Sequence, residues 1–230
     1  MSESIRFIKR GVLAGVAVAT MAACQAPKQT LTSLQVTSLR ALDLEEKVTR
    51  SDELLMAYSL TAVDANGRAL ETINGSWGIQ EARKGQVFAE KAFQAIQIPI
   101  PKNGRVVASL VLVEVDDYDK ARKTLTEVRK YHDIVKVPAG LAELADIALT
   151  PIKYLSLGLS AAGVAFQLAD RLDNDDILGQ HSTELTYEKA LVTPLLQVPL
   201  QFKGNNLGNS FHYELAYDLR TSTVRLKPKR

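Results

Sequence analysis

Apolar and polar residues alternate over the first half of the chain in a pattern that is typical of β-strands. Partial alternation begins near Thr32, and strands are predicted over 53–63, 70–80, 86–100 and 106–115. Two Asn-Gly pairs, which adopt positive φ at little cost, and a Pro-Ile-Pro segment separate the later strands. The last of them, VVASLVLVEV, is the most apolar and is predicted to be a central strand.

The middle of the chain changes to a helical period. Good helix formers fill 119–130 and 139–148, and a third helix is predicted over 150–172 because Thr-Pro is a favourable start. Its uncharged stretch, 154–169, has 16 residues, fewer than the roughly 20 that a membrane-spanning helix needs. Two interpretations of 150–172 stay open. It is a buried core helix, or it is a membrane-active or oligomerising helix whose small residues permit close packing.

Strand-like alternation returns near the C-terminal end of the chain, over 181–188, 195–202, 210–219 and 221–226. About eight strands, interrupted by one helical excursion, predict a mainly β fold. We expect an antiparallel β-sandwich with a helical insertion at about residues 118–172, all within a single domain over 34–230. A strict period of two predicts one buried face for the series Phe211, Tyr213, Leu215, Tyr217 and Leu219.

Composition narrows the classes of function. Of 230 residues, 46% are hydrophobic and 23% are charged, which is ordinary usage for a globular protein. The net charge of +2 is too small to indicate a nucleic-acid partner. A single cysteine excludes an intrachain disulfide and a zinc site built from several thiolates.

The first two dozen residues have the pattern of a secretory signal peptide. Arg6, Lys9 and Arg10 form a positive start, and residues 11–23 then run without charge. These 13 residues are too few to cross a bilayer as a helix. We therefore predict that residues 1–23 are a signal peptide.

The end of this segment, Met21-Ala-Ala-Cys24, resembles the lipobox of bacterial lipoproteins, with Met21 at a position where that family usually has Leu. The resemblance implies cleavage before Cys24 and attachment of diacylglyceryl to its sulfur, so that acyl chains such as palmitate anchor the protein to a membrane. Gln25, rather than Asp, implies the outer membrane. Residues 24–33 are then the lipidated cysteine and a short polar tether.

Two groups of aspartates flank the predicted insertion. Adjacent antiparallel strands leave and re-enter a sheet at the same end, so we expect the groups to converge at one end of the molecule. Converging carboxylates suit Ca²⁺, which accepts six to eight oxygens in irregular geometry. The alternative is that these residues serve turns and helix ends through local backbone bonds. The groups are Asp116, Asp117 and Asp119, and Asp170, Asp173, Asp175 and Asp176.

The second group, followed by Ile-Leu-Gly179 and a predicted strand, is similar to the acidic loop of C2 domains. That resemblance implies calcium ligation by Asp170, Asp173, Asp175 and Asp176, and more loosely by the first group. The segment before the loop has a helical pattern here, whereas a C2 domain has a strand there.

No catalytic motif accompanies these features. His132, His181 and His212 have no regular metal-ligand spacing, and neither a Gly-x-Ser-x-Gly nor a phosphate-binding loop is present. We therefore expect a protein without catalysis, a lipid-anchored binding or scaffold module of the cell envelope with an unidentified envelope protein as partner. A hydrolase would require a pocket in which a histidine contacts a carboxylate.

Overall fold

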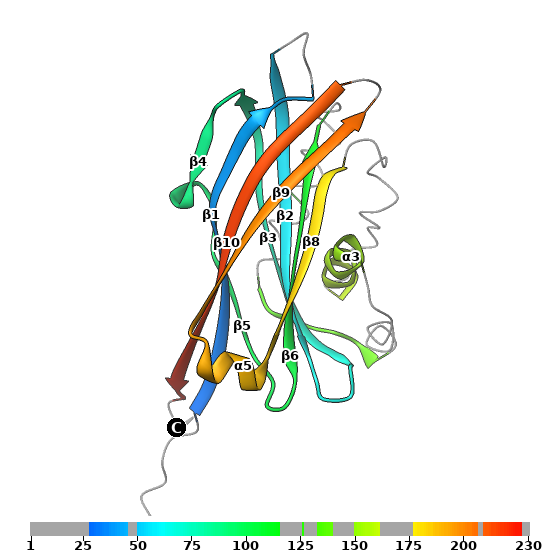
Figure 1. The fold of residues 1–230 in the computed structure, drawn as a ribbon. Coiled ribbons are helices and arrows are strands. Elements are labelled where there is room, and N and C mark those ends of the chain that lie inside the picture. Colours follow the sequence, from blue (N-terminus) through cyan, green and yellow to red (C-terminus); the bar gives the residue numbers. More distant parts are fainter. Residues whose placement is uncertain are drawn as a thin grey trace, which may run out of the picture.

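Two antiparallel sheets pack face to face in the computed structural model, which describes residues 28–45, 50–115, 126, 133–139, 150–161, 177–206 and 209–226. Sheet A contains β1 (Lys28–Asp43), β4 (Val87–Ala89), β5 (Ile96–Pro99), β9 (Leu195–Asn206) and β10 (Asn209–Arg225). Sheet B contains β2 (Ser51–Val63), β3 (Ala69–Arg83), β6 (Arg105–Glu114), β7 (Val135–Lys136) and β8 (Ile177–Thr186). Helix α3 (Pro151–Ala161) belongs to the insertion between β6 and β8, and helix α5 (Tyr187–Val192) connects the two sheets. The predicted antiparallel β-sandwich with a helical insertion is confirmed (Figure 1).

The main core lies between the sheets and is built from alternate residues of the strands. Sheet A has the order β4-β1-β10-β9, with β5 also paired to β1, and sheet B has the order β7-β3-β2-β6-β8. The predicted buried face of β10 is confirmed, since its alternating apolar residues are all buried. They pack with the inward residues of β1, β2 and β6, among them Leu34, Leu39, Met56, Tyr58, Leu110 and Leu112.

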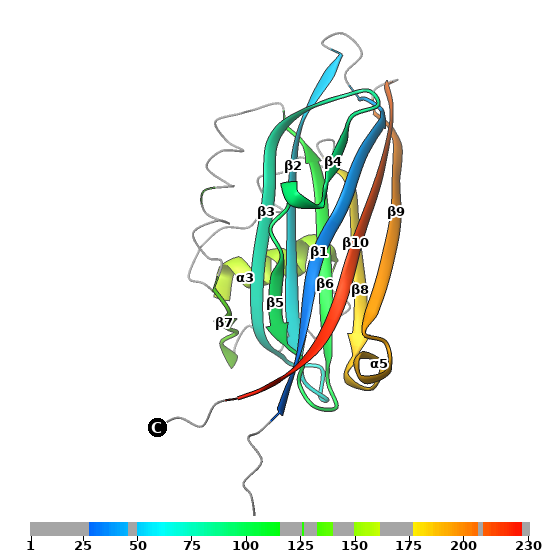
Figure 2. The ribbon, with the colours of Figure 1, turned by 90° about the vertical axis from the view of Figure 1, so that its left-hand side faces the viewer.

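The central strands β2 and β6 of sheet B are buried on both of their faces. Helix α3 packs on the face away from sheet A (Figure 2), through the buried side chains of Ile152, Tyr154, Leu155 and Leu157. Strand β6 lies between β2 and β8, and from Val106 to Glu114 its residues are buried. The uninterrupted apolar run of this strand therefore marked a central position, as predicted.

Residues 86–100 do not form the single strand that was predicted. They form β4 and β5 on either side of a short 3-10 helix, η1 (Glu90–Ala92). Ser38 pairs with Ala89, and Leu34 pairs with Ile96. An advance of four residues along β1 therefore lies opposite an advance of seven residues from β4 to β5. The extra residues turn Phe93 into the core, where its ring centroid lies 5.2 Å from that of Trp77.

The predicted tether is too long. Strand β1 begins at Lys28, which pairs with Arg225 of β10, and the strand is continuous through Ser33. Thr30 and Thr32 are already buried. Residues 28–33 therefore belong to the sandwich, and three residues, 25–27, lie between Cys24 and β1.

Candidate functional site

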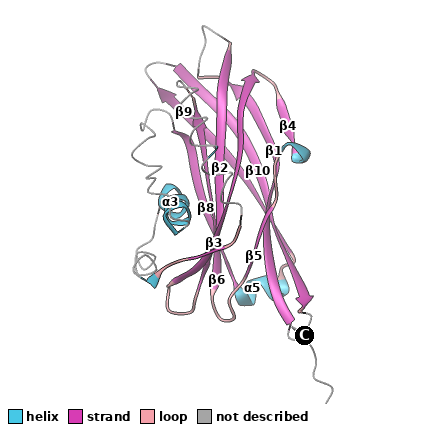
Figure 3. Cartoon of the chain, turned by 180° about the vertical axis from the view of Figure 1, so that it is seen from behind, coloured by secondary structure: helices cyan, strands magenta, loops and turns pink. Residues whose placement is uncertain are grey.

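The outer faces of the two sheets differ. The outer face of sheet B is packed against α3, whereas the structure places no described element over the outer face of sheet A (Figure 3). We call the latter the open face. Its side chains come from the alternate, outward positions of β1, β10 and β9, and most are polar. They include Ser33, Gln35, Ser38, Arg40, Glu214, Ala216, Asp218, Arg220, Gln197, Pro199 and Gln201.

A shallow hollow of about 620 Å³ lies on the open face. Arg40 and Glu214, from adjacent strands, form an ion pair of 4.0 Å within its lining, and both side chains remain substantially exposed. An exposed pair of this kind contributes little to stability, so both groups are available to a ligand. The rest of the lining is Ser38, Val87, Pro199, Leu200, Gln201, Leu215 and Ala216.

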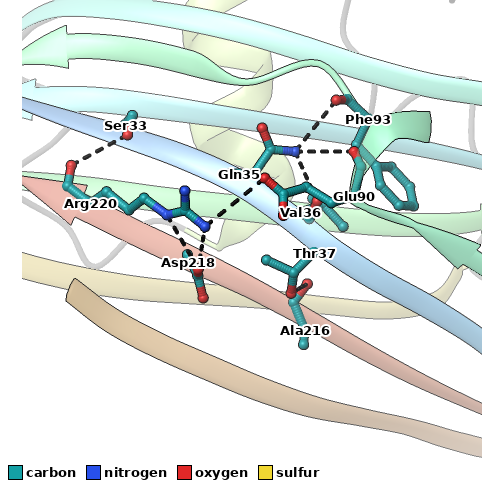
Figure 4. A network of polar contacts seen from close by, with 9 residues as sticks. All are labelled: Ser33, Gln35, Val36, Thr37, Glu90, Phe93, Ala216, Asp218 and Arg220. Atoms are coloured by element: carbon teal, nitrogen blue, oxygen red, sulfur yellow. Dashed lines mark hydrogen bonds and ion pairs between the residues drawn. The ribbon is translucent and has the colours of Figure 1, made fainter.

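A polar network holds η1 at the rim of the open face (Figure 4). The amide of Gln35 donates hydrogen bonds to the carbonyl oxygens of Val36, Glu90 and Phe93. Because these acceptors belong to β1 and to the segment of η1, Gln35 ties the two together.

Arg220 strengthens the same rim. Its guanidinium donates to the carboxylate of Asp218 at 2.9 Å and lies 3.9 Å from that of Glu90. Asp218, followed by Glu90, raises the pKa of Arg220. The side chain of Asp218 is nearly buried. The guanidinium of Arg220 offsets the cost of removing the carboxylate of Asp218 from water.

The charges of the open face are mixed in sign. Arg40 and Arg220 each lie beside a carboxylate, and the remaining lining is amide, hydroxyl or small apolar. The described lining of the hollow contains no aromatic side chain on which a sugar ring or a base could stack. Such a surface is suited to the mixed charges and peptide groups of another protein.

Cys24 and all seven aspartates of the predicted calcium site lie outside the described residues, so lipidation and calcium binding stay predictions. The strand ends that flank the insertion are described. Val113 near the end of β6 pairs with Ile177 at the start of β8, so the chain leaves and re-enters sheet B at one end, as expected. Within the described ranges, no group of three or more acidic, histidine or cysteine side chains could hold a metal ion.

Gly179, which the C2-like pattern included, has a packing role. It lies in β8, and a Cβ at this position would come 2.1 Å from the ring of Phe202 on β9. Its lack of a side chain lets the edges of the two sheets close on one another.

The two described histidines do not form a catalytic arrangement. His181 lies 2.9 Å from the hydroxyl of Thr183, and burial lowers its pKa. Neither His181 nor His212 makes a hydrogen bond or ion pair with a described carboxylate, and neither lines the hollow. His132 lies outside the described residues.

The described part of the apolar segment 150–172 is a core element. Tyr154 and Leu155 of α3 are buried on sheet B, where the helix contacts β2, β3, β6 and β8. Residues 162–172 are outside the described ranges. None of the described helices combines the length and the hydropathy of a membrane-spanning segment.

Sequence comparison adds no relative: no protein family model matches the chain, and no curated protein is significantly similar to it. Sequence analysis did not single out the open face either. The only sign of the open face in the sequence is the run of polar residues at alternate positions of β1 and β10. That pattern marks a face that points outward, but it does not show whether another element covers that face.

Proposed function

We propose that this protein is a non-catalytic binding module of the bacterial cell envelope, anchored by lipid on Cys24, which binds its partner through the open face of sheet A. The observation that carries the binding role is the asymmetry of the sandwich. One outer face is packed against α3, whereas none of the described elements covers the other, which has a hollow of about 620 Å³.

The chemistry of the open face favours a protein as the partner. Its ion pair of Arg40 and Glu214 offers one charge of each sign, and Gln201 and Ser38 add hydrogen-bonding groups. Matched charges across an interface improve specificity and association rate more than affinity. A partner presenting an acidic and a basic residue side by side, as protein surfaces commonly do, fits this arrangement. The acidic groups at residues 116–119 and 170–176 are a separate proposal for Ca²⁺ binding.

Lipidation is tested by metabolic labelling with palmitate. We expect the wild-type protein to incorporate the label and to fractionate with outer membranes. We expect Cys24→Ala to lose the label and to remain uncleaved, because the acceptor sulfur is absent. The same substitution leaves the described sandwich, which begins at Lys28, unchanged. Equal labelling of both forms would contradict the anchor.

The open face is tested by photo-crosslinking in intact cells. We expect p-benzoylphenylalanine in place of Gln201 or Ser38 to give a discrete crosslinked product. The same residue in place of Lys153, which is exposed on α3 beside the covered sheet, should give none.

Charge reversal then asks whether that product depends on the hollow. Arg40→Glu should lower the yield of the product several-fold because it places two negative charges in the lining, whereas the control Lys153→Glu should leave the yield unchanged. Products of equal yield from Gln201 and Lys153, or no effect of Arg40→Glu, would remove the open face as the binding site.

A further inference from the structure

Helix α5 closes one end of the sandwich. It connects β8 of sheet B to β9 of sheet A, and the amide of Tyr187 donates to the carbonyl oxygen of Gly104 in the turn before β6. The hydroxyl of Thr186 caps the helix by accepting from the amide of Lys189. Ala190 is buried against the core, and the ring of Tyr187 packs against it. One side of this short helix is thus committed to the core.

The exposed side of α5 carries two apolar residues beside Glu188 and Lys189. Leu191 and Val192 are 57% and 78% exposed, and Leu195, just after the helix, is also exposed. Leu191 and Val192 end the helix, and Leu195 begins β9 after two intervening residues; we call these three residues the α5 tip. An aliphatic side chain left in water gives up about 1.5–3 kcal/mol relative to full burial. Val192, one of the most exposed apolar side chains described, contributes nothing to the fold that explains its identity.

Positively charged residues gather at the end of the sandwich that carries α5. The strand ends and turns at this end carry Lys28, Arg68, Lys102, Lys189 and Arg225. The carboxylates there include those of Asp64, Glu188 and Glu184. The last of these lies 3.4 Å from the guanidinium of Arg105, and the Oδ1 of Asp64 accepts from the amides of Asn66 and Arg68. Exposed apolar side chains together with an excess of cations are the combination that binds an anionic lipid surface.

The position of the tip relative to the chain's start identifies the membrane as the occupant. Both views show α5 at the same end as the start of β1 and the end of β10 (Figures 1 and 2). From Cys24 to Lys28 the chain spans at most about 14 Å. Strand β1 alone has 16 residues, a length of about 50 Å. A lipid on Cys24 therefore brings the α5 end, rather than the opposite end, to the bilayer.

We propose that the α5 tip is a second membrane contact, in which Leu191 and Val192 enter the interfacial layer of an anionic phospholipid bilayer while the lysines and arginines at this end of the sandwich face its headgroups. This inference rests on the proposed anchor at Cys24 for its orientation. The diacylglyceryl group proposed on Cys24 already supplies two acyl chains, which suffice for attachment, so the α5 tip acts on the orientation of the sandwich rather than on its anchoring. The contact fixes the sandwich upright, with the open face directed sideways.

The test uses a chain that begins at Gln25. It retains every strand of both sheets and contains no cysteine, because Cys24 is the only one in the sequence. Val192→Cys carries a nitrobenzoxadiazole dye at the tip. The matched control is Val87→Cys, an exposed valine on β4 near the opposite end. The probes are vesicles of phosphatidylglycerol mixed with phosphatidylcholine, and vesicles of phosphatidylcholine alone.

We expect the dye at position 192 to shift to the blue and brighten with phosphatidylglycerol vesicles, and the dye at position 87 to stay unchanged. In flotation of the undyed chain, Leu191→Ser with Val192→Ser should weaken vesicle binding about tenfold or more, and Val87→Ser should not. Lys189→Glu should weaken binding to the vesicles that contain phosphatidylglycerol. It should not change binding to vesicles of phosphatidylcholine alone.

Equal responses at both dye positions, or no vesicle binding, would overturn the inference. A blue shift at position 192 that needs no vesicles and grows with protein concentration would overturn it in favour of contact between two copies. Palmitate labelling of Cys24 is scored separately. The anchor can therefore fail while the tip still binds vesicles, and the tip can fail while Cys24 is labelled.

Discussion

Gly78→Ala is expected to destabilise the sandwich by about 3 kcal/mol or more, which is a large share of the stability of a typical domain. Gly78 has a φ of 111°, a region that residues with a side chain rarely adopt. A Cβ there would come 2.3 Å from the carbonyl oxygen of Leu54 on the neighbouring strand. That obstacle is backbone within a central pair of strands, so it cannot move aside as a side-chain end could.

Gly85→Ala is the matched control for this substitution. Gly85 also has a positive φ, of 83°, but a Cβ there would meet no atom within 4 Å. It should therefore cost about 1 kcal/mol, the strain of the backbone alone. Urea unfolding followed by far-ultraviolet circular dichroism measures both. If Gly78→Ala does not accumulate in folded form while Gly85→Ala does, the prediction also holds. Equal and small losses for the two variants would contradict it.

The strand pattern was predictable wherever one physical cause decided it. The alternation in β10 reflects a single buried face, and the continuous apolar run of β6 reflects burial on two faces. In both cases the burial of side chains determines the spacing of apolar residues, which can be read from the sequence. The helical insertion was predictable for the same reason, because its change of period coincides with the chain leaving sheet B.

Interruptions of that pattern were not predictable. The prediction made 210–219 and 221–226 two strands, whereas β10 runs unbroken from Asn209 to Arg225 because its last residues pair with the start of β1. Helix α5 was missed because six residues are too few to show a helical period. The 3-10 helix η1 was missed because three residues show no period, and its segment is held by the burial of Phe93 and by hydrogen bonds from Gln35 of β1. Each depends on a contact with a strand distant in sequence.

The candidate site depends on such distant contacts even more. The hollow combines Ser38, Val87, Gln201 and Glu214 from four strands. Nothing in any one of these strands shows that sheet B, and not sheet A, receives α3. The α5 tip, by contrast, is visible in the sequence in part, as an apolar Leu-Val step in a polar connection, but the role proposed for it depends on its lying at the end of the sandwich where β1 begins (Figure 1).

The second large effect is expected at Tyr213, whose hydroxyl donates to the carboxylate of Asp52. Asp52 is fully buried and also accepts from the amide of Glu45 at 2.8 Å. Burial, followed by Asp52 and the nearby charges of Glu114 and Glu45, raises the pKa of Tyr213. The phenol therefore stays protonated and acts as a donor to this carboxylate at any pH at which the protein is studied.

Tyr213→Phe should destabilise the fold by about 2–3 kcal/mol, because it removes a donor from a buried carboxylate. Tyr217 provides a close control on the same strand and the same face. It is equally buried, but its hydroxyl donates to the neutral hydroxyl of Thr183 at 2.9 Å. Tyr217→Phe should therefore cost only about 1 kcal/mol. Urea unfolding followed by the fluorescence of Trp77, which is buried between Phe88 and Phe93, reports both.

A double-mutant cycle with Asp52→Asn assigns the difference to the pair. The amide introduced by that substitution keeps the shape of the side chain but not its charge, so Tyr213→Phe should cost less in that background than in the wild type. Tyr217→Phe should cost the same in both backgrounds, because the hydroxyl of Tyr217 donates to Thr183 and not to Asp52. If Tyr213→Phe proves no more costly than Tyr217→Phe, the buried charge at Asp52 is not what the hydroxyl of Tyr213 stabilises.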